Sequence, residues 1–216
     1  MNPKAIRLQK TGAAFTLVEV LVVIAIMTVL TSLLLPALGR GHEMARVSKV
    51  REELYQIGLA LDMYGSDTKN SFPPVRVNCN TDLATHWCEL PVELAGYLNH
   101  DSAPGMAVDL EDVFNPQHTY KYAAPGPELL NGNANGNYSL WVPSNMVTMT
   151  GDGCYYTDPK LSPVRWVVWS LGPLPNGPKA LDTYAPLNSE SWYRRAGDTG
   201  VIARYADPAG RQCLTY

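Results

Sequence analysis

A long apolar run stands near the N-terminus of the chain. It extends from Phe15 to Leu35, and its only charged residue is Glu19. About 21 helical residues at a rise of ~1.5 Å per residue span ~31 Å, which matches the ~30 Å hydrocarbon core of a bilayer. The run therefore predicts one membrane-spanning helix. Glu19 is a functional candidate, because a carboxylate without a partner is costly in lipid.

A second apolar pattern begins at Val47 and has helical spacing. Steps of three and four residues place its apolar members on one face, while charged residues occupy the other faces. Such an amphipathic helix must bury its stripe, and the simplest cover is a globular domain that follows it. Gly65, Ser66 and Asp67 predict its end. The members of the stripe are Val47, Val50, Leu54, Ile57, Leu61 and Tyr64.

Pro36 separates the two patterns. Proline removes the amide that would bond to the Ser32 carbonyl, so it predicts a kink. We expect the Thr31 and Ser32 hydroxyls to help satisfy the freed carbonyls. The preferred interpretation is one kinked helix over residues 15–64, and the alternative is two helices joined at Pro36.

The chain from residue 66 to residue 216 has a different character. Most of the 17 glycines and 17 prolines lie there, which favours short strands and long loops. A short helix is expected over residues 90–98, and the segment 131–137 is expected to form the tip of a hairpin. With the long helix, these elements predict an α+β fold with a small antiparallel sheet. The candidate strands are 119–123, 138–142, 164–171 and 201–205.

Three cations lie just before the apolar run, and they orient it. Lys4, Arg7 and Lys10 hold that end of the helix in the cytoplasm. A secretory signal places small residues after a shorter apolar stretch, whereas here Gly12, Ala13 and Ala14 come before a long one. A plain signal anchor explains the length and the flanking charges but gives Glu19 no role.

The segment Ala14–Ile26 resembles the prepilin cleavage and methylation motif of type IV pilin-like proteins. The resemblance implies that prepilin peptidase cuts between Ala14 and Phe15 and methylates the new Phe15 amine. Glu19 then becomes the fifth mature residue and Pro36 the twenty-second, as in that family. The family usually has glycine before the cut, where this chain has Ala14, so a cut after Gly12 is the alternative.

The resemblance also implies a role for Glu19 in assembly, as the partner of the Phe15 amine of a neighbouring subunit. An intermolecular charge pair in low dielectric is strong, and leaving either charge alone is costly. The alternative is a carboxylate that only reaches the headgroups. The implied partners are other copies or related pilins, prepilin peptidase, an inner-membrane assembly platform and membrane lipid.

The same resemblance divides the chain into four segments. Residues 1–14 are a cytoplasmic leader that is removed, and residues 15–36 are the transmembrane and assembly half of the helix. Residues 37–65 are its amphipathic half, and residues 66–216 are an exported globular domain. The implied location is the bacterial inner membrane, single-pass, with the N-terminus cytoplasmic and the domain periplasmic or in an extracytoplasmic filament.

A more specific likeness is to the major pseudopilins of type II secretion, the general secretion pathway protein G type. It rests on the segments 56–64 and 72–74, on 112–116 with 120–126, and on 168–172. Those proteins carry a calcium loop after the last of these segments. Here residues 173–176 stand where its first aspartate would be and only Asp182 remains nearby, so we expect no cofactor, and bound calcium is the alternative.

Four cysteines lie in the segment predicted to be exported, where disulfides persist. An even number predicts two bridges among three connectivities, and the expected pairs are Cys79–Cys88 and Cys154–Cys213. The alternative is a metal site that joins His86 to Cys88. We expect no metal, because this spacing is unlike the paired ligands of zinc sites.

The sequence contains no phosphate-binding loop and no nucleophile motif, so we expect no enzyme. Loss of the leader changes the formal net charge from −3 to −6, with 14 basic against 20 acidic residues. An acidic domain argues against a nucleic-acid partner. The leading hypothesis is a structural subunit of a pilus or pseudopilus. The alternative is an anchored binding module that uses the pilin signal only for export.

Overall fold

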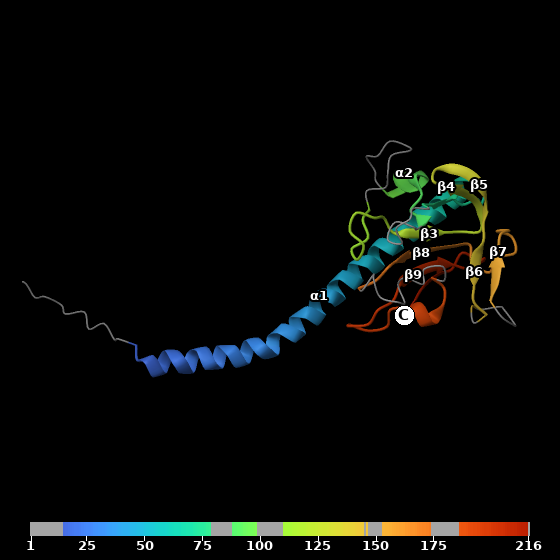
Figure 1. Ribbon diagram of the computed structural model, residues 1–216. Coiled ribbons are helices and arrows are strands. Elements are labelled where there is room, and N and C mark those ends of the chain that lie inside the picture. Colours follow the sequence, from blue (N-terminus) through green and yellow to red (C-terminus); the bar gives the residue numbers. More distant parts are fainter. Residues whose placement is uncertain are drawn as a thin grey trace, which may run out of the picture. The chain divides into compact units, whose positions relative to one another are not determined.

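The computed structural model describes residues 15–78, 88–98, 110–144, 146, 153–173 and 186–215. These residues fall into two units, 1–42 and 43–216, and each unit is described by itself below. Figure 1 shows the helices and strands along the chain. The long helix has residues in both units, and all the strands belong to the second.

The helix α1 runs from Leu17 to Asp67 and continues through Pro36. The expected single helix over residues 15–64 is therefore confirmed with small shifts at both ends, and the alternative of two helices is wrong. The kink itself stays a prediction. The chain leaves the helix through Lys69 and Asn70, whose φ angles of 57° and 71° are left-handed and cannot continue it.

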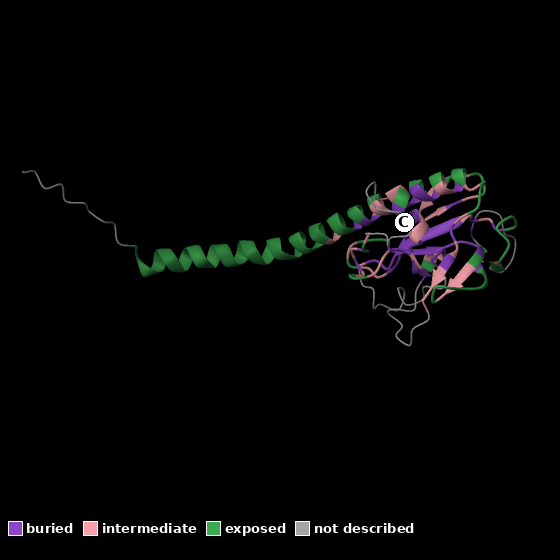
Figure 2. Cartoon of the chain, turned by 90° about the horizontal axis from the view of Figure 1, so that it is seen from above, coloured by how far each residue is buried: buried purple, intermediate pink, exposed green. Residues whose placement is uncertain are grey.

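The predicted stripe on the second half of α1 is buried in the second unit. Val47, Val50, Leu54, Ile57 and Leu61 are all nearly inaccessible to solvent, as expected from their spacing. In Figure 2 the helix residues of this unit alternate between buried and exposed, as an amphipathic helix does. Tyr64, the last member of the stripe, is only partly buried against the core.

The stripe packs on a sheet of eight strands that is antiparallel except for one pair. Their order across the sheet is β10-β9-β8-β3-β2-β1-β4-β5, and β1 and β4 are the parallel pair. The predicted α+β class is therefore confirmed. The strands are β1 (Val75–Val77), β2 (Cys88–Glu89), β3 (Lys121–Ala123), β4 (Gly126–Leu130), β5 (Asn133–Tyr138), β8 (Trp166–Ser170), β9 (Ile202–Ala206) and β10 (Gln212–Leu214).

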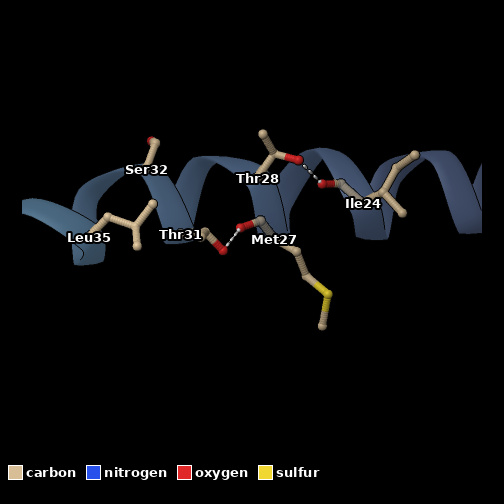
Figure 3. A pocket seen from close by; sticks show the side chains of 6 residues that line it. All are labelled: Ile24, Met27, Thr28, Thr31, Ser32 and Leu35. Carbon is tan, nitrogen blue, oxygen red and sulfur yellow. Dashed lines mark hydrogen bonds between the residues drawn. The ribbon is translucent and has the colours of Figure 1, made fainter. Parts of the chain in front are cut away.

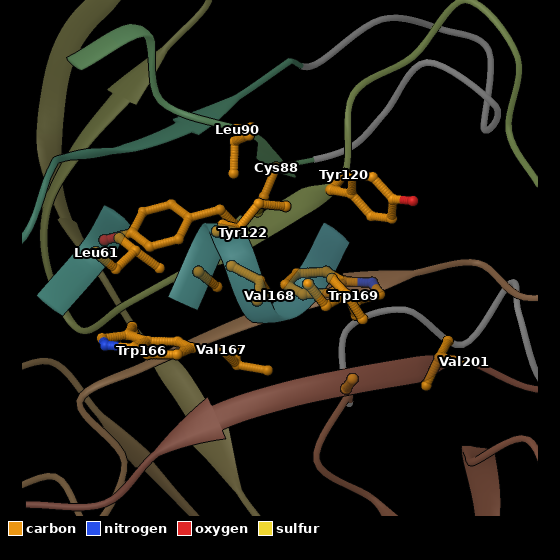
Figure 4. Packing of buried hydrophobic residues seen from close by; sticks show 14 of the residues in the cluster. Leu61, Cys88, Leu90, Tyr120, Tyr122, Trp166, Val167, Val168, Trp169 and Val201 are labelled. Carbon is orange, nitrogen blue, oxygen red and sulfur yellow. The ribbon is translucent and has the colours of Figure 1, made fainter. Parts of the chain in front are cut away.

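The strand β8 lies at the centre of the core, and all five of its residues are buried. Figure 4 shows Trp166, Val167, Val168 and Trp169 of this strand in the cluster that also contains Leu61 of α1. Burial on both faces explains its nearly continuous apolar sequence. A second sheet is formed by β6 (Leu140–Val142) and β7 (Cys154–Tyr156).

The four candidate strands correspond to β3, β6, β8 and β9, each within a few residues of the expected bounds. The short helix expected over residues 90–98 is present as a 3-10 turn η1 (Val92–Leu94) followed by α2 (Ala95–Leu98). A further 3-10 turn, η2, covers Ser189–Ser191.

The expectation of a loop over residues 131–137 is wrong in extent. Only Asn131 and Gly132 form the turn between β4 and β5, and residues 133–138 form β5 itself. Both turn residues have positive φ, 49° and 83°, as a type I′ turn requires. The hairpin was predicted, but the asparagine-rich composition concealed its second strand.

Replacement of Leu54 by alanine should test the burial of the stripe. Leu54 is fully buried, so Leu54→Ala should lower the free energy of unfolding by about 2–5 kcal/mol. The control Leu59→Ala, on the same helix at 43% exposure, should cost less than about 1 kcal/mol. The measurement is denaturant unfolding in detergent, followed by tryptophan fluorescence. Equal losses in the two variants would contradict the packing described.

Candidate assembly and membrane segment

The N-terminus of α1 is closed by hydrogen bonds between Thr16 and Glu19. The Glu19 Oε2 atom accepts from the Thr16 backbone nitrogen at 2.8 Å and from the Thr16 hydroxyl at 2.8 Å. The Thr16 Oγ1 atom in turn accepts from the Glu19 backbone nitrogen at 3.2 Å. Thr16 precedes the first helical residue and Glu19 is the third, so the pair forms a reciprocal capping box.

The capping box gives Glu19 a role that was not expected from the sequence. The signal was present, because threonine followed three residues later by glutamate before an apolar run is typical of a capping box. A carboxylate in the first helical turn also faces the positive end of the helix dipole. Within one chain, Glu19 is thus already bonded before any neighbour is considered.

The apolar side chains that follow Glu19 have no protein cover within their unit. The large hydrophobic side chains from Leu17 to Leu38 are all exposed, with between 48% and 79% of their surface accessible to solvent. Phe15, just before the helix, is 84% exposed. By length and composition α1 is able to cross a membrane, and its most apolar window is not buried at all.

Three hydroxyl groups inside this apolar segment bond back to the helix. Thr28 Oγ1 donates to the Ile24 carbonyl at 2.7 Å, and Thr31 Oγ1 donates to the Met27 carbonyl at 2.8 Å. Figure 3 shows both bonds beside a shallow groove on the helix surface. Hydroxyls that are bonded in this way can lie in lipid without an unsatisfied donor.

The Ser32 hydroxyl donates to the Val29 carbonyl at 2.7 Å. The carbonyl freed by Pro36 is that of Ser32, so neither Thr31 nor Ser32 satisfies it. Our expectation for these two hydroxyls was wrong. In a helix a serine or threonine hydroxyl reaches carbonyls that precede it, whereas the carbonyl freed by Pro36 belongs to Ser32 itself.

In the second unit, Asp112 joins the segment 112–116 to the end of β8. Its Oδ1 atom accepts from the Ser170 hydroxyl at 2.7 Å and from the Phe114 nitrogen at 3.0 Å. Its Oδ2 atom accepts from the Leu171 nitrogen at 3.1 Å. Asp112 is completely buried, so these bonds compensate the loss of water and fix the segment 112–116 at the end of β8.

A buried lysine lies near Asp112. Lys121 is inaccessible to solvent, and its backbone lies opposite that of Glu89 in the register of β3 and β2. Burial lowers the pKa of Lys121 to about 8, and the charges of Glu89 and Asp112 oppose this shift. Burial likewise raises the pKa of Asp112, against its three hydrogen bonds and the Lys121 charge. The region is therefore a structural junction that balances charge inside the core.

Two residues near the start of the amphipathic half of α1 form hydrogen bonds with two surface loops. Glu43 accepts from the Gly197 nitrogen at 3.0 Å and from the Tyr193 hydroxyl at 3.2 Å. Arg46 donates to the Val113 carbonyl at 2.5 Å, and its guanidinium carbon lies 4.5 Å from the centre of the Phe114 ring. These contacts order the domain surface at the point where the buried part of the helix begins.

The structure does not contain the expected Cys154–Cys213 bridge. Both are unbridged thiols, and they lie on strands of different sheets, with Cys154 opposite Val142 and Cys213 opposite Tyr205. Cys79 lies outside the described residues, and no bridge of Cys88 is described. The pairing of Cys79 with Cys88 stays a prediction.

Several other expected site residues also fall outside the described residues. They include Ala14 and the whole leader, as well as His86 and Asp182. Among the residues that the structure describes, no three His, Cys, Asp or Glu side chains are grouped as they would be around a metal ion. The expectations about the cleavage site, calcium and metal are therefore untested.

Comparison with known proteins agrees with the N-terminal assignment. Residues 10–35 match the family described as the prokaryotic N-terminal methylation motif. No curated protein and no solved structure matches the chain. The motif, the apolar helix and the α+β fold together support a type IV pilin-like protein, structural or exported. They are consistent with membrane anchoring by a single pass.

The buried lysine predicts a pH dependence of stability. With a folded pKa of about 8 and an unfolded pKa of 10.5, the unfolded chain holds the extra proton between these values. The free energy of unfolding therefore rises with pH in this window, by up to about 1.4 kcal/mol per pH unit. The rise should disappear in Lys121→Met, and it should remain in Lys49→Met, which changes an exposed lysine. The measurement is denaturant unfolding between pH 7.5 and 9.5. Parallel pH profiles for wild type and Lys121→Met would contradict it.

Proposed function

We propose that the protein is a structural subunit of a pilus or pseudopilus, of the type II secretion kind, that assembles through its N-terminal helix. The observation that carries the proposal is the methylation motif joined to a helix whose apolar side chains are exposed all along residues 17–38. Lipid covers such a surface in the membrane. Outside the membrane an apolar protein surface must cover it, and the same helix of other subunits provides such a surface, which favours polymerisation.

The carboxylate of Glu19 gives the assembly its register. Cleavage before Phe15 creates a cation at the membrane edge, about one helical turn from Glu19. The Phe15 amine of one subunit and the Glu19 carboxylate of the next then compensate each other in low dielectric. Prepilin peptidase, an inner-membrane platform and other pilin subunits are the partners that this route requires.

The second candidate is an anchored binding module that uses the pilin-type signal only for export. The capping box supports this candidate, because it gives Glu19 a role within a single chain that needs no neighbour. In that case the glutamate serves only to begin the helix. Variants at Glu19 separate the two functions.

Two Glu19 variants should distinguish charge pairing from capping. Glutamine at the third helical position preserves a capping box and removes the anion. We expect Glu19→Gln and Glu19→Leu both to insert in the membrane and both to lose filament assembly. The readouts are membrane fractionation and crosslinking between N-terminal helices, with the exposed Glu190→Gln as the control.

Normal assembly of Glu19→Gln beside failure of Glu19→Leu would assign Glu19 to capping alone. A wild-type protein that is strictly monomeric in the membrane would refute the structural-subunit proposal and support the binding module.

Processing of the leader is tested separately by the mass of the mature chain. We expect an N-methylated Phe15 at its start after expression with a prepilin peptidase, and the uncut chain without the peptidase. A mature chain that begins at Ala13 would instead show a cut after Gly12. Because the family usually has glycine before the cut, we expect the wild type to be cut more slowly than Ala14→Gly. The measurement is the ratio of uncut to mature protein.

A further inference from the structure

A cavity of about 550 Å³ with charged and apolar lining residues opens at the end of the second unit where α1 finishes. It is lined by the turn after α1, by the loop between β7 and β8, and by the turn between β9 and β10. Its volume is within the range of ordinary ligand sites. None of the roles discussed above for the N-terminal helix uses it.

Three cationic side chains line this cavity: Lys69 from the turn after α1, and Lys160 and Arg165 from the loop between β7 and β8. None of them forms an ion pair with an acidic side chain of the described residues. The one acidic residue in the lining, Asp158, accepts from the Lys160 backbone nitrogen at 2.9 Å. The cavity is therefore a local excess of positive charge on an acidic chain.

Arg165 is held in place by its neighbours. Its guanidinium carbon lies 4.8 Å from the centre of the Phe72 ring, and the guanidinium donates to Asn70 Oδ1. Asn70 is itself fixed by its backbone bond to the Gly65 carbonyl at 2.7 Å. A guanidinium fixed in this way loses little freedom when it binds a carboxylate, and its fork geometry suits that group.

The walls between the cations are apolar. Phe72, Pro159 and Pro208 contribute carbon surface rather than hydrogen-bond donors. A ligand that fits must combine carboxylates with a carbon framework between them.

We propose that this cavity is a docking site for a short acidic peptide segment of a partner protein, bound through its Asp or Glu carboxylates. Arg165 forms the directed contact, and Lys69 and Lys160 supply attraction at the rim. The proposal is independent of filament assembly, because the Glu19 variants leave the site intact.

The test uses the full chain in neutral detergent and a fluorescein-labelled hexaglutamate peptide, with binding followed by anisotropy. We expect saturable binding that weakens at least about tenfold in Lys160→Gln/Arg165→Gln, since each lost charge-assisted bond is worth more than that factor. Arg195→Gln removes an exposed charge elsewhere and should bind as wild type does.

Arg165 also stacks on Phe72, so its replacement could disturb the fold as well as binding. A second variant therefore leaves Arg165 in place. Lys69→Gln/Lys160→Gln changes only exposed side chains and should also weaken binding. Equal weakening by Arg195→Gln would show a net-charge effect and overturn the site. The proposal would also be overturned if hexalysine bound as well as hexaglutamate, or if an oligodeoxythymidylate bound more tightly. Complete displacement by equimolar inorganic phosphate would show a general anion site and overturn the assignment to a peptide.

Discussion

The burial of one stripe of α1 against the sheet is the constraint on which the second unit depends. Burying a leucine or isoleucine side chain contributes about 1.5–3 kcal/mol, and the stripe has several such residues at zero exposure. Gly58 allows the helix to lie close to the sheet, because a Cβ atom at this position would meet the Trp166 ring at 3.0 Å and the Gln212 side chain at 2.5 Å. The helix is therefore a central element of the domain's core.

The two halves of α1 meet different surroundings with the same backbone. In the second half, one apolar face is buried, and the charged residues lie on the other faces. In the first half, apolar residues occupy all faces, and the polar groups after Glu19 are short hydroxyls bonded to the helix itself. This change of pattern is what supports a membrane or assembly role for the first half and a packing role for the second.

The sequence predicted the elements whose patterns are periodic. The stripe from Val47 to Leu61 and the apolar strand β8 were recognised because burial imposes a spacing or a continuous run on them. The capping box at Thr16 and the junction at Asp112 were missed. Asp112 is bonded to Ser170 across 58 positions, and no local pattern reports such a contact. Strand β5 was missed because its exposed residues face no core and so carry no apolar alternation.

The composition of β5 affects how one edge of the sheet meets other molecules. This strand is at one margin of the eight-stranded sheet, and its backbone could pair with the same strand of another molecule. Asn135 is an extra residue opposite the junction of Glu128 and Leu129, and it makes the ladder irregular there. Gly136 adds a left-handed φ of 141°, and the strand offers little apolar surface. Such a margin resists strand-to-strand aggregation.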